Sequence, residues 1–483
     1  MIPDYVLKAI KELQASGYEA YIVGGCVRDF LMKKVPNDWD ITTNAKPEEV
    51  LAVFKEAKYE NTFGTVLLPV RTAKKDQAAK GELQDVLEIT TYRSEQNYSD
   101  RRHPDIIRFE TELDKDLERR DFTINALALD PADNKIIDLF GGQKDIKAKI
   151  IRAVGEPSDR FKEDALRMMR AVRFSAQLGF KLEPKTQRAI TKLAGSLKFV
   201  SAERIRDELV KILASNQPAE GIMLLQECKL LQYILPELEQ GVGVDQSRHH
   251  IYPVFKHNVL ALKYCPNPAW PVRFAALLHD IAKPKTHRII DGIATFYNHE
   301  QLGAKMAAKI MTRLKFSHED RERVVNLVKN HMFYYNVGEV TAASVRRLIV
   351  KVGRENLQDL IDLRVADRLG SGTPKAMPYK LRHLQYMLEK VQNDPVSVKM
   401  LKINGDDLMK ILCISPSPKI GAILDVLLGE VIEEPEKNTA SLLAKRAQEL
   451  NQFNLEELRI KAREVIEEKR EAEDKEIKKQ FKV

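Results

Sequence analysis

An apolar run that ends at two glycines constrains the N-terminal third of the chain most strongly. Ala20 to Val23 is typical of a buried strand, Gly24 and Gly25 follow it, and the next residues open a helix. Glycine lets backbone N–H groups approach an anion closely, and the helix dipole favours negative charge at this end of a helix. The segment therefore predicts a phosphate-binding turn, although paired glycines on their own more often form an ordinary turn.

Two aspartates follow this turn in the sequence Asp38-Trp39-Asp40, ahead of an apolar segment. On a strand their carboxylates would share one face, because alternate residues of a strand point the same way. Neighbouring carboxylates repel each other unless a cation lies between them, and hard cations such as Mg²⁺ prefer oxygen ligands. A solvated strand edge is the plain alternative. Together with the phosphate-binding turn, the pair indicates nucleotidyl transfer with two metal ions.

The two features together resemble the start of a known superfamily. The resemblance is carried by Gly24-Gly25, Val27-Arg28-Asp29 and Asp38-Trp39-Asp40. In this order they are similar to the nucleotidyltransferases, and among these to the class II tRNA nucleotidyltransferases (CCA-adding enzymes) and bacterial poly(A) polymerases. The resemblance implies catalytic Mg²⁺ binding by Asp38 and Asp40, and triphosphate binding by Gly24, Gly25 and Arg28.

The family has a third acidic residue in a strand that precedes a Thr-Thr-aromatic-Arg sequence. Here that sequence is Thr90-Thr91-Tyr92-Arg93, and Glu88 lies in the strand-like run before it. The resemblance implies that Glu88 is a catalytic acid facing Asp38 and Asp40, whereas the residues alone allow an outward-facing strand glutamate. The polar stretch 98–105 corresponds to the family's flexible loop for the change from C to A addition. Its presence favours full CCA addition, with a plain surface loop as the alternative.

A second specific resemblance begins at Arg119-Arg120-Asp121 and continues through Phe122-Thr123-Ile124-Asn125. Two arginines and an aspartate are ordinarily a capped helix end, but the longer string is specific to the family. It implies that Arg120 holds the triphosphate and that Asp121 holds the ribose hydroxyl. The chemistry suits both roles, because a guanidinium donates two hydrogen bonds to phosphate and a carboxylate accepts from sugar hydroxyls.

From residue 152 to about 240, glycines become scarce and the apolar spacing becomes helical. The spacing predicts one helix over residues 161–174, on which Asp164 and Arg167 are three residues apart and share a face. A solvated ion pair is the ordinary interpretation of such residues. The alternative is that they recognise a nucleotide base.

Base recognition by such a pair has a physical basis. Cytosine and adenine place an exocyclic amine donor beside a ring-nitrogen acceptor, whereas guanine and uracil place a carbonyl beside a ring N–H. An aspartate beside an arginine therefore fits C and A and leaves groups unpaired against G and U, at roughly 1–3 kcal/mol for each lost pairing. The family's Glu-Asp-x-x-Arg-x-x-Arg motif is matched by Glu163, Asp164, Arg167 and Arg170.

The resemblance extends this nucleotide-binding set along the chain. It implies base recognition by Asp164 and Arg167, with Arg170 and Arg173 as further nucleotide-binding residues. A later helix, which begins near Ser201, resembles the family's last neck motif. There Glu203 or Arg204 would support the segment that reads the base.

An apolar segment ending in His279-Asp280, followed by Lys283 and a proline, resembles the HD phosphohydrolases. A single histidine in a helical region is ordinarily structural, but the resemblance supplies a full ligand set. It implies one metal held by His257, His279, Asp280 and Asp367, and a second held by His299 and His331. Imidazole and carboxylate ligands suit Mn, Fe, Ni or Zn. Some CCA-adding enzymes use such a domain on 2′,3′-cyclic phosphates, so we expect metal binding and leave hydrolysis or a structural role open.

Composition excludes several classes of protein. The 483 residues are 44% hydrophobic, which is enough for several domains with buried cores. The sequence contains no run of eighteen apolar residues, so no membrane-spanning helix is expected. The N-terminal segment is typical of an amphipathic helix rather than a signal peptide. Four dispersed cysteines without a CxxC motif fit a reducing cytoplasm. The net charge of +8, from 78 basic and 70 acidic residues, permits a nucleic-acid partner.

The expected fold class is α+β, with a small mixed α/β nucleotidyltransferase head followed by mostly α-helical neck, HD and tail domains. The expected boundaries are 1–150, 151–240, 245–385 and 386–483. Residues 403–409 and 416–421 resemble the family's tail, where a turn opens a helix onto an RNA phosphate, although Ser417 replaces a glycine common in relatives. Recognition of tRNA by shape and backbone suits an enzyme that accepts every tRNA.

The sequence as a whole predicts a cytoplasmic enzyme that adds C, C and A to tRNA from CTP and ATP without a nucleic-acid template. Four alternatives stay open: an enzyme adding only CC or only A, a poly(A) polymerase, an HD phosphohydrolase with a vestigial head, and an inactive RNA-binding protein. Intact Asp38, Asp40 and Arg120 argue against the last. The sequence makes no prediction of the oligomeric state.

Overall fold

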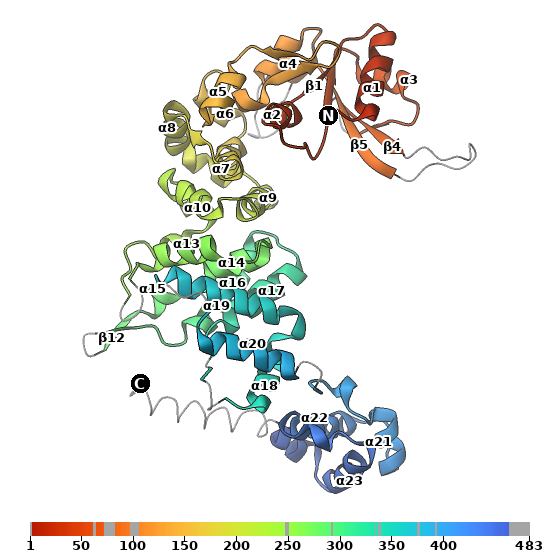
Figure 1. The fold of residues 1–483 in the computed structure, drawn as a ribbon, viewed down its shortest axis with the longest axis vertical. Helices are drawn as coiled ribbons and strands as arrows, with labels where there is room; N and C mark the ends of the chain where they lie inside the picture. Colours follow the sequence, from red (N-terminus) through yellow and green to blue (C-terminus); the bar gives the residue numbers. More distant parts are fainter. Residues whose placement is uncertain are drawn as a thin grey trace.

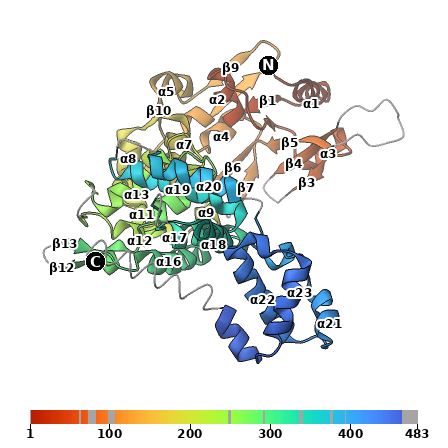
Figure 2. The same cartoon turned by 60° about the horizontal axis from the view of Figure 1, so that its bottom comes forward.

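The computed structural model shows an elongated, curved molecule with an α/β head at one end and a small helical tail at the other (Figure 1). The neck and HD regions lie between them as stacked helices, which Figure 2 shows from nearer the tail. The expected α+β fold class is confirmed. The structure describes residues 2–60, 64–71, 83–96, 106–246, 251–290, 293–333, 335–336, 340–373, 377–391 and 394–462.

A seven-stranded mixed sheet forms the head, with strand order β3-β4-β5-β2-β1-β8-β9. In chain order the strands are β1 (Ala20–Val23), β2 (Asp40–Thr43), β3 (Lys58–Tyr59), β4 (Thr65–Arg71), β5 (Leu83–Thr91), β8 (Leu127–Asp130) and β9 (Lys135–Asp138). β2 and β5 are parallel neighbours, while β1 is antiparallel to β2 and to β8. A separate antiparallel pair consists of β6 (Arg93–Gln96) and β7 (Ile106–Phe109).

Helices cover both faces of this sheet because its strands bury both sides. In β1, Ile22 packs with α1 (Asp4–Ala15) and α3 (Pro47–Val53), whereas Val23 packs on the opposite face with α4 (Leu113–Glu118). α2 (Gly25–Leu31) follows β1 directly, and α5 (Gly142–Ala148) ends the head. The strand-to-helix junction at the paired glycines is therefore as expected.

The neck consists of short helices and one small pair of parallel strands, β10 (Ile150–Ile151) and β11 (Lys181–Leu182). Its helices are α6 (Pro157–Glu163), α7 (Leu166–Leu178), α8 (Pro184–Leu193), α9 (Ala202–Leu213), α10 (Pro218–Glu227), α11 (Leu231–Ile234) and α12 (Pro236–Glu239). The prediction of one continuous helix over 161–174 is wrong. The chain is extended at Asp164, with φ −140° and ψ 107°, and the Asp164 carboxylate accepts a hydrogen bond from the Leu166 backbone N–H at the start of α7.

The HD region contains most of the remaining helices. They are α13 (Val254–Tyr264), α14 (Trp270–Leu278), α15 (Lys283–Thr286), α16 (His299–Arg313), α17 (His318–Asn330), α18 (Ala342–Val352) and α19 (Leu357–Gly370), with a hairpin of β12 (Arg288–Ile290) and β13 (Ile293–Thr295). α13 and α19 approach closely, because a Cβ on Gly370 would lie 2.7 Å from the Ala261 backbone nitrogen. One buried apolar cluster joins α7 and α9 of the neck to α14 and α17.

The chain continues through α20 (Tyr379–Val391) into a tail of α21 (Gly405–Leu412), α22 (Pro418–Glu433) and α23 (Ala440–Leu450). Arg346 of α18 joins the HD region to the tail. Its guanidinium donates hydrogen bonds to the backbone carbonyl oxygens of Ile432 and Glu433 and to the carboxylate of Asp394. These carbonyls end α22, where a cation also meets the negative end of the helix dipole.

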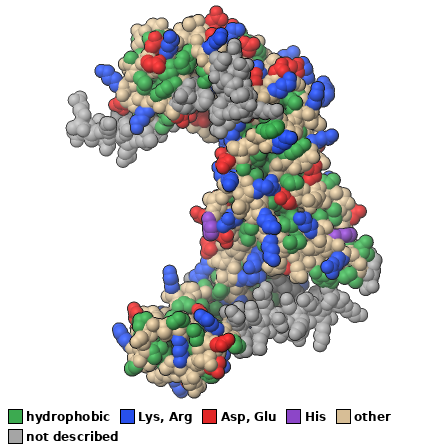
Figure 3. Space-filling view, turned by 180° about the vertical axis from the view of Figure 1, so that it is seen from behind, with side chains coloured by type: hydrophobic (Ala, Val, Ile, Leu, Met, Phe, Trp, Pro, Cys, Tyr) green, Lys and Arg blue, Asp and Glu red, His purple; other side chains and the backbone are tan. Residues whose placement is uncertain are grey.

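The surface carries both signs of charge. Figure 3 shows Lys and Arg interspersed with Asp and Glu over neck and HD region, and a deep hollow between head and tail on one side. Within the described residues, no helix has the length and apolar character needed to cross a membrane.

Candidate functional site

Two carboxylates meet on the parallel strands at the centre of the head sheet. Asp40, the first residue of β2, is in register with Glu88 of β5. Burial, with the charges of Glu88 and Asp38, raises the pKa of Asp40 to about 7. Burial and the charges of Glu60 and Asp38 raise the pKa of Glu88. Carboxylates whose pKa is raised by burial and by neighbouring carboxylates form a favourable place for a cation.

Asp38 lies near this pair but not on the strand. β2 begins at Asp40, and Asp38 is an exposed residue of the preceding bend. The expectation that both aspartates share a strand face is therefore wrong. The side chain of Trp39 is buried, so the chain enters the core at Trp39 and leaves Asp38 outside the sheet. The charge of Asp38 still raises the pKa of both Asp40 and Glu88.

The turn after β1 brings a glycine backbone against the acids. Gly24 has a φ of 89°, a conformation that strains any residue with a Cβ. A Cβ at this position would lie 3.0 Å from Nη1 of Arg120 and 3.7 Å from Oδ2 of Asp40. The glycine turn, the arginine expected to hold phosphate and the central carboxylate thus converge on one place.

A buried carboxylate that the sequence analysis missed positions Arg120. Asp116 of α4 is fully buried and accepts hydrogen bonds from Arg120 Nη2 at 3.1 Å and from Arg119 Nη2 at 2.6 Å. Burial alone would raise the pKa of Asp116, but the two arginines lower it. Asp116 lies one helical turn before Arg120, and this i, i+4 spacing was the available sequence signal.

Asn125 connects two of the expected nucleotide-binding residues. Its Oδ1 accepts a hydrogen bond from Arg28 Nη1 at 2.7 Å, and its Nδ2 donates to Asp121 Oδ1 at 3.1 Å. Arg28 also binds both carboxylate oxygens of Asp29. The guanidinium of Arg28 lies 3.6 Å from the position of a Cβ on Gly25, so it stands at the start of α2, fixed by protein contacts.

Asp121 links the head to the nucleotide-binding segment of the neck. Its Oδ2 accepts from Arg170 Nε and Nη2, both at 2.7 Å. Burial alone would raise the pKa of Asp121, but the charge of Arg170 and the Asn125 hydrogen bond lower it to about 2. In this structure the carboxylate expected to meet the ribose is therefore held ionised by an arginine of α7.

Three arginines surround the ring of Phe174 on α7. The guanidinium carbons lie 5.3, 5.5 and 4.2 Å from its centroid, and belong to Arg28, Arg170 and Arg173 respectively. Arg173 is buried and donates to Glu208 of α9 at 3.3 Å; burial lowers its pKa to about 10. A guanidinium over the face of an aromatic ring is attracted by the negative charge of that face. Arg173 is therefore held between Glu208 and the ring of Phe174.

Asp164 and Arg167 do not pair with each other. Nη1 and Nη2 of Arg204 donate to Oδ1 and Oδ2 of Asp164 at 3.2 and 2.7 Å. Arg167 instead donates to Glu163 at 2.6 Å and to the Arg119 backbone carbonyl at 3.3 Å. The expectation of an Asp164–Arg167 pair on one helix face is wrong, because α6 ends before Asp164 and α7 begins after it. Arg204 is the neck residue that contacts Asp164.

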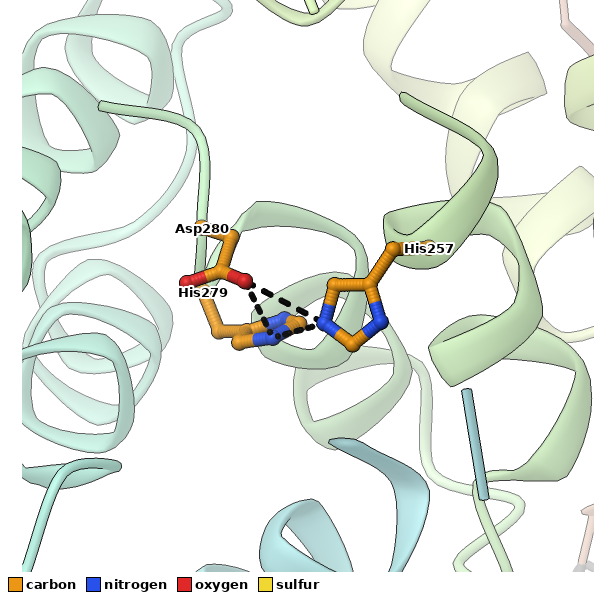
Figure 4. Close-up of side chains that lie close together, drawn as sticks. All are labelled: His257, His279 and Asp280. Atoms are coloured by element: carbon orange, nitrogen blue, oxygen red, sulfur yellow. Dashed lines mark hydrogen bonds and ion pairs between the residues drawn. The ribbon is translucent and has the colours of Figure 1, made fainter. Parts of the chain in front are cut away.

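The six expected HD ligands meet in one buried centre. Figure 4 shows His257 of α13 and His279 with Asp280 at the end of α14 pointing toward one another. Nε2 of His257 lies 3.0 Å from Nε2 of His279, 3.1 Å from Asp280 and 3.3 Å from Asp367 of α19. On the other side of Asp280, its Oδ1 lies 3.1 Å from His299 and 3.7 Å from His331.

Three of the four histidines, His279, His299 and His331, are oriented as metal ligands. Nδ1 of His279, His299 and His331 each lies within 2.7–2.8 Å of a backbone carbonyl oxygen. Because that carbonyl accepts the Nδ1 proton, the Nε2 lone pair is directed toward the centre, as in metal sites. Two ligand groups result, His257 with His279 and Asp280, and Asp280 with His299 and His331, so Asp280 bridges them. This donor set fits one or two divalent transition metals.

Electrostatics of the centre also favour a cation. Burial lowers the pKa of His279, but Asp280 and Asp367 more than compensate and raise it to about 10. Burial and the neighbouring histidines lower the pKa of His331 to about 3. The buried carboxylates thus favour positive charge in the centre, while the imidazole of His331 stays neutral and able to bind metal.

One expected element lies outside the described residues, the stretch 98–105, which was expected as the flexible loop. The turn at Ser417 does open a helix, α22, and the Ser417 side chain makes no capping hydrogen bond there.

Comparison with known families gives three matches along the chain. Residues 20–152 match the poly A polymerase head domain, residues 179–241 match the probable RNA and SrmB-binding site of polymerase A, and residues 260–371 match the HD domain. The fold and sites therefore define a nucleotidyltransferase with a helical RNA-binding neck and an appended HD domain.

Whole-chain relatives identify the family. The CCA-adding enzyme of Enterococcus faecalis is 34% identical over 438 residues, 90% of this chain and 93% of the relative. The A-adding tRNA nucleotidyltransferase of Deinococcus radiodurans is 38% identical over 349 residues, 68% of this chain and 78% of the relative. The chain belongs to the class II CCA-adding enzymes, the tRNA nucleotidyltransferases, and carries an HD domain in addition.

Solved structures agree with this fold. The crystal structure of the Bacillus stearothermophilus CCA-adding enzyme in complex with CTP matches with a TM-score of 0.69 and 27% identity, over 94% of this chain and 98% of that one. The Thermotoga maritima CCA-adding enzyme complexed with tRNA matches with a TM-score of 0.54 and 19% identity, over 93% and 96%. The second likeness concerns the fold alone.

Proposed function

We propose that this protein adds C, C and A in turn to the 3′ end of tRNA, using CTP and ATP and no nucleic-acid template. The observation that carries the proposal is the convergence of Gly24, Arg120 and Asp40 on one place beside Glu88. A phosphate-binding turn, a cation for phosphate and paired acids for metal are the parts that nucleotidyl transfer needs. The relative in complex with CTP supports the choice of nucleotide, and the named CCA-adding and tRNA nucleotidyltransferase relatives support tRNA as the acceptor.

Asp38, Asp40 and Glu88 would hold Mg²⁺ in the head. These are oxygen ligands, which Mg²⁺ prefers, and the raised pKa of Asp40 reflects a charge that a divalent cation would relieve. Bound divalent metals supply activation of the tRNA 3′-hydroxyl and neutralisation of the leaving pyrophosphate. Gly24, Gly25 and Arg120 would hold the triphosphate; Arg28 would support them from the start of α2.

Base selection is assigned to the junction of α6 and α7. Asp164 would accept a hydrogen bond from the exocyclic amine of C or A, and Arg167 would donate to the ring nitrogen. In the present contacts both side chains are held by protein partners, Arg204 and Glu163. Arg170 connects this region to Asp121, the proposed ribose ligand, so base and sugar recognition share one network.

Addition of A alone is the second candidate. The specific observation in its favour is the 38% identity to the A-adding enzyme of Deinococcus radiodurans. The two candidates use the same head acids and the same base-reading residues. They differ in whether a tRNA without its two cytidines is extended.

The HD centre is assigned a second activity, metal-dependent hydrolysis of phosphate esters. Asp280 between two imidazole groups is the observation that supports it. When bound, a divalent transition metal supplies an activated water and polarises a phosphate ester. His257, His279 and Asp367 would hold one ion, and His299 with His331 a second. We also assign the head to residues 1–150, the neck to 151–240, the HD domain to 245–385 and a tRNA-binding tail to 386–483.

Two single substitutions distinguish the contribution of the head site from that of the HD centre. Asp40→Asn removes an acid of the head, and Asp280→Asn removes the bridge of the HD centre, while neither residue contacts the other region. We expect Asp40→Asn to abolish CMP and AMP incorporation into tRNA and Asp280→Asn to retain it. Incorporation that survives Asp40→Asn unchanged would assign the chemistry elsewhere.

A further inference from the structure

Two arginines of α19 lie beside the HD centre and are not among its ligands. Arg364 donates from Nη1 to Oδ2 of Asp367 at 2.8 Å, while Oδ1 of the same carboxylate faces His257 Nε2 at 3.3 Å. The carboxylate of Asp367 therefore lies between the guanidinium of Arg364 and the imidazole of His257. Its side chain is 28% exposed, so it lies at the rim of the centre, where a ligand from solvent can reach it.

Arg368 adds a second guanidinium on the same side of α19. It follows Asp367 directly and lies four residues after Arg364, a spacing that brings two side chains together on a helix. Its Nε is buried and has no hydrogen-bond partner among the described residues. Two like charges at this spacing repel each other. A ligand that accepts from both would remove the repulsion and satisfy the buried N–H.

The carboxylate of Asp367 is not free to bind Arg368 as well. Its Oδ2 is taken by Arg364 and its Oδ1 by the imidazoles of His257 and His279. A further cation borders the centre, because Nζ of Lys283 lies 2.6 Å from Oδ2 of Asp280. Divalent metals would add still more positive charge. The missing partner is therefore an anion.

We propose that Arg364 and Arg368 form the phosphate subsite of the HD centre, so that the substrate's phosphate group lies between the metal ligands and these two guanidinium groups. The inference rests on the hydrolytic role assigned to this centre. Guanidinium N–H groups form a planar fork that matches phosphate oxygens, and the ring of Phe333, 5.9 Å from the Arg364 guanidinium, fixes that fork at the rim. The ligand class is a phosphate monoester or diester.

The test measures phosphate binding without turnover. The full chain carrying Asp40→Asn, which weakens metal binding in the head, is loaded with Mn²⁺ and freed of excess metal. Metal content is measured directly, and ³¹P relaxation of added inorganic phosphate reports phosphate that binds next to Mn²⁺. Arg368→Ala is the main variant, because within the described part of the chain no hydrogen bond or ion pair joins Arg368 to a metal-ligand side chain. Arg368→Lys is the conservative variant. Arg382→Ala, an exposed arginine of α20, is the matched control.

We expect Arg368→Ala to keep its Mn²⁺ and to weaken phosphate binding roughly 10-fold or more, the usual effect of losing a charged hydrogen bond. Arg368→Lys should fall between, and Arg382→Ala should match the parent. Phosphate binding that is unchanged in Arg368→Ala at equal metal content contradicts the inference, as does a metal-loaded parent that binds no phosphate. A parent that retains no Mn²⁺ at the HD centre instead overturns the hydrolytic role, and the subsite with it.

Discussion

Arg204 of α9 holds both carboxylate oxygens of Asp164, through N–O distances of 3.2 and 2.7 Å. This contact fixes the aspartate in the extended junction between α6 and α7. Without it, the carboxylate would keep only the hydrogen bond from the Leu166 backbone N–H. The acceptor that we assign to base selection is thus positioned by a residue of a different helix, 40 positions later in the chain.

Replacement of Arg204 should damage base selection more than folding. We expect Arg204→Ala to lower the preference for CTP over UTP and for ATP over GTP roughly 10-fold, because a charged hydrogen bond to Asp164 is lost. Single-turnover rates with each nucleotide measure this preference. Arg188→Ala, an exposed arginine on α8, is the matched control and should retain it. Unchanged selectivity in Arg204→Ala would remove Asp164 from the account of base recognition.

Gly24 offers a test of the phosphate turn with a close control. Gly24 and Gly17 both have positive φ angles, 89° and 88°, so an added Cβ strains the backbone at both positions. Only at Gly24 would the Cβ meet Arg120 and Asp40; at Gly17 it meets nothing within 4 Å. We expect Gly24→Ala to lower nucleotide incorporation roughly 100-fold, as a 1 Å misplacement of reacting groups does. Equal activities of the two variants would contradict this.

The salt link between Asp121 and Arg170 predicts an acid-sensitive part of the stability. The pKa of Asp121 is lowered to about 2, below the value near 3.9 of an unfolded aspartate. Its stabilisation is therefore fully present above about pH 4 and is lost as the pH falls toward 2, with a size of about 2 kcal/mol. Urea unfolding at pH 7 and pH 3 should show a smaller loss for Asp121→Asn than for the parent.

The outcome that opposes this prediction is equal acid sensitivity of the parent and Asp121→Asn. Asp133→Asn is a suitable control, because Asp133 is an exposed residue of the turn before β9. It should lose as much stability on acidification as the parent does. The comparison isolates one carboxylate among the 70 acidic residues of the chain.

Metal binding at the HD centre should depend on Asp280 above all other ligands, because it belongs to both ligand groups. We expect Asp280→Asn to lose bound transition metal, and EDTA to lower the melting temperature of the parent but not of this variant, since a ligand of the native state stabilises it. His318→Ala, an exposed histidine at the start of α17, should behave as the parent. Full metal content in Asp280→Asn would exclude Asp280 as the bridge.

Local patterns predicted the elements that carry the head. The apolar run before Gly24 forms β1, and the stretch that contains Glu88 forms β5, because alternating or continuous apolar residues specify strands directly. Asp38 was misplaced because the burial of Trp39, a tertiary effect, sets where β2 begins. The sequence therefore predicts the interior of an element well and its first and last residues poorly.

Long-range partners explain most of what the sequence did not reveal. Asp164 satisfies its carboxylate with Arg204, and this partner is chosen by the packing of α7 on α9 rather than by helical spacing. Asp116 is one acid among many in the sequence, and its i, i+4 spacing to Arg120 gains meaning only with its complete burial and its hydrogen bond to that arginine. The HD ligands were found together because a specific resemblance, not periodicity, connected His257 to Asp367.

Primer extension on three tRNA transcripts tests the central claim most directly. The transcripts end at the discriminator base, at C and at CC, and each receives CTP, ATP, GTP or UTP singly and then CTP with ATP, in the presence of Mg²⁺. We predict stepwise addition that stops after CCA, with no use of GTP or UTP. Addition of A only to the transcript ending in CC would assign the A-adding activity instead, and addition of CC alone or a growing A ladder would also contradict the account.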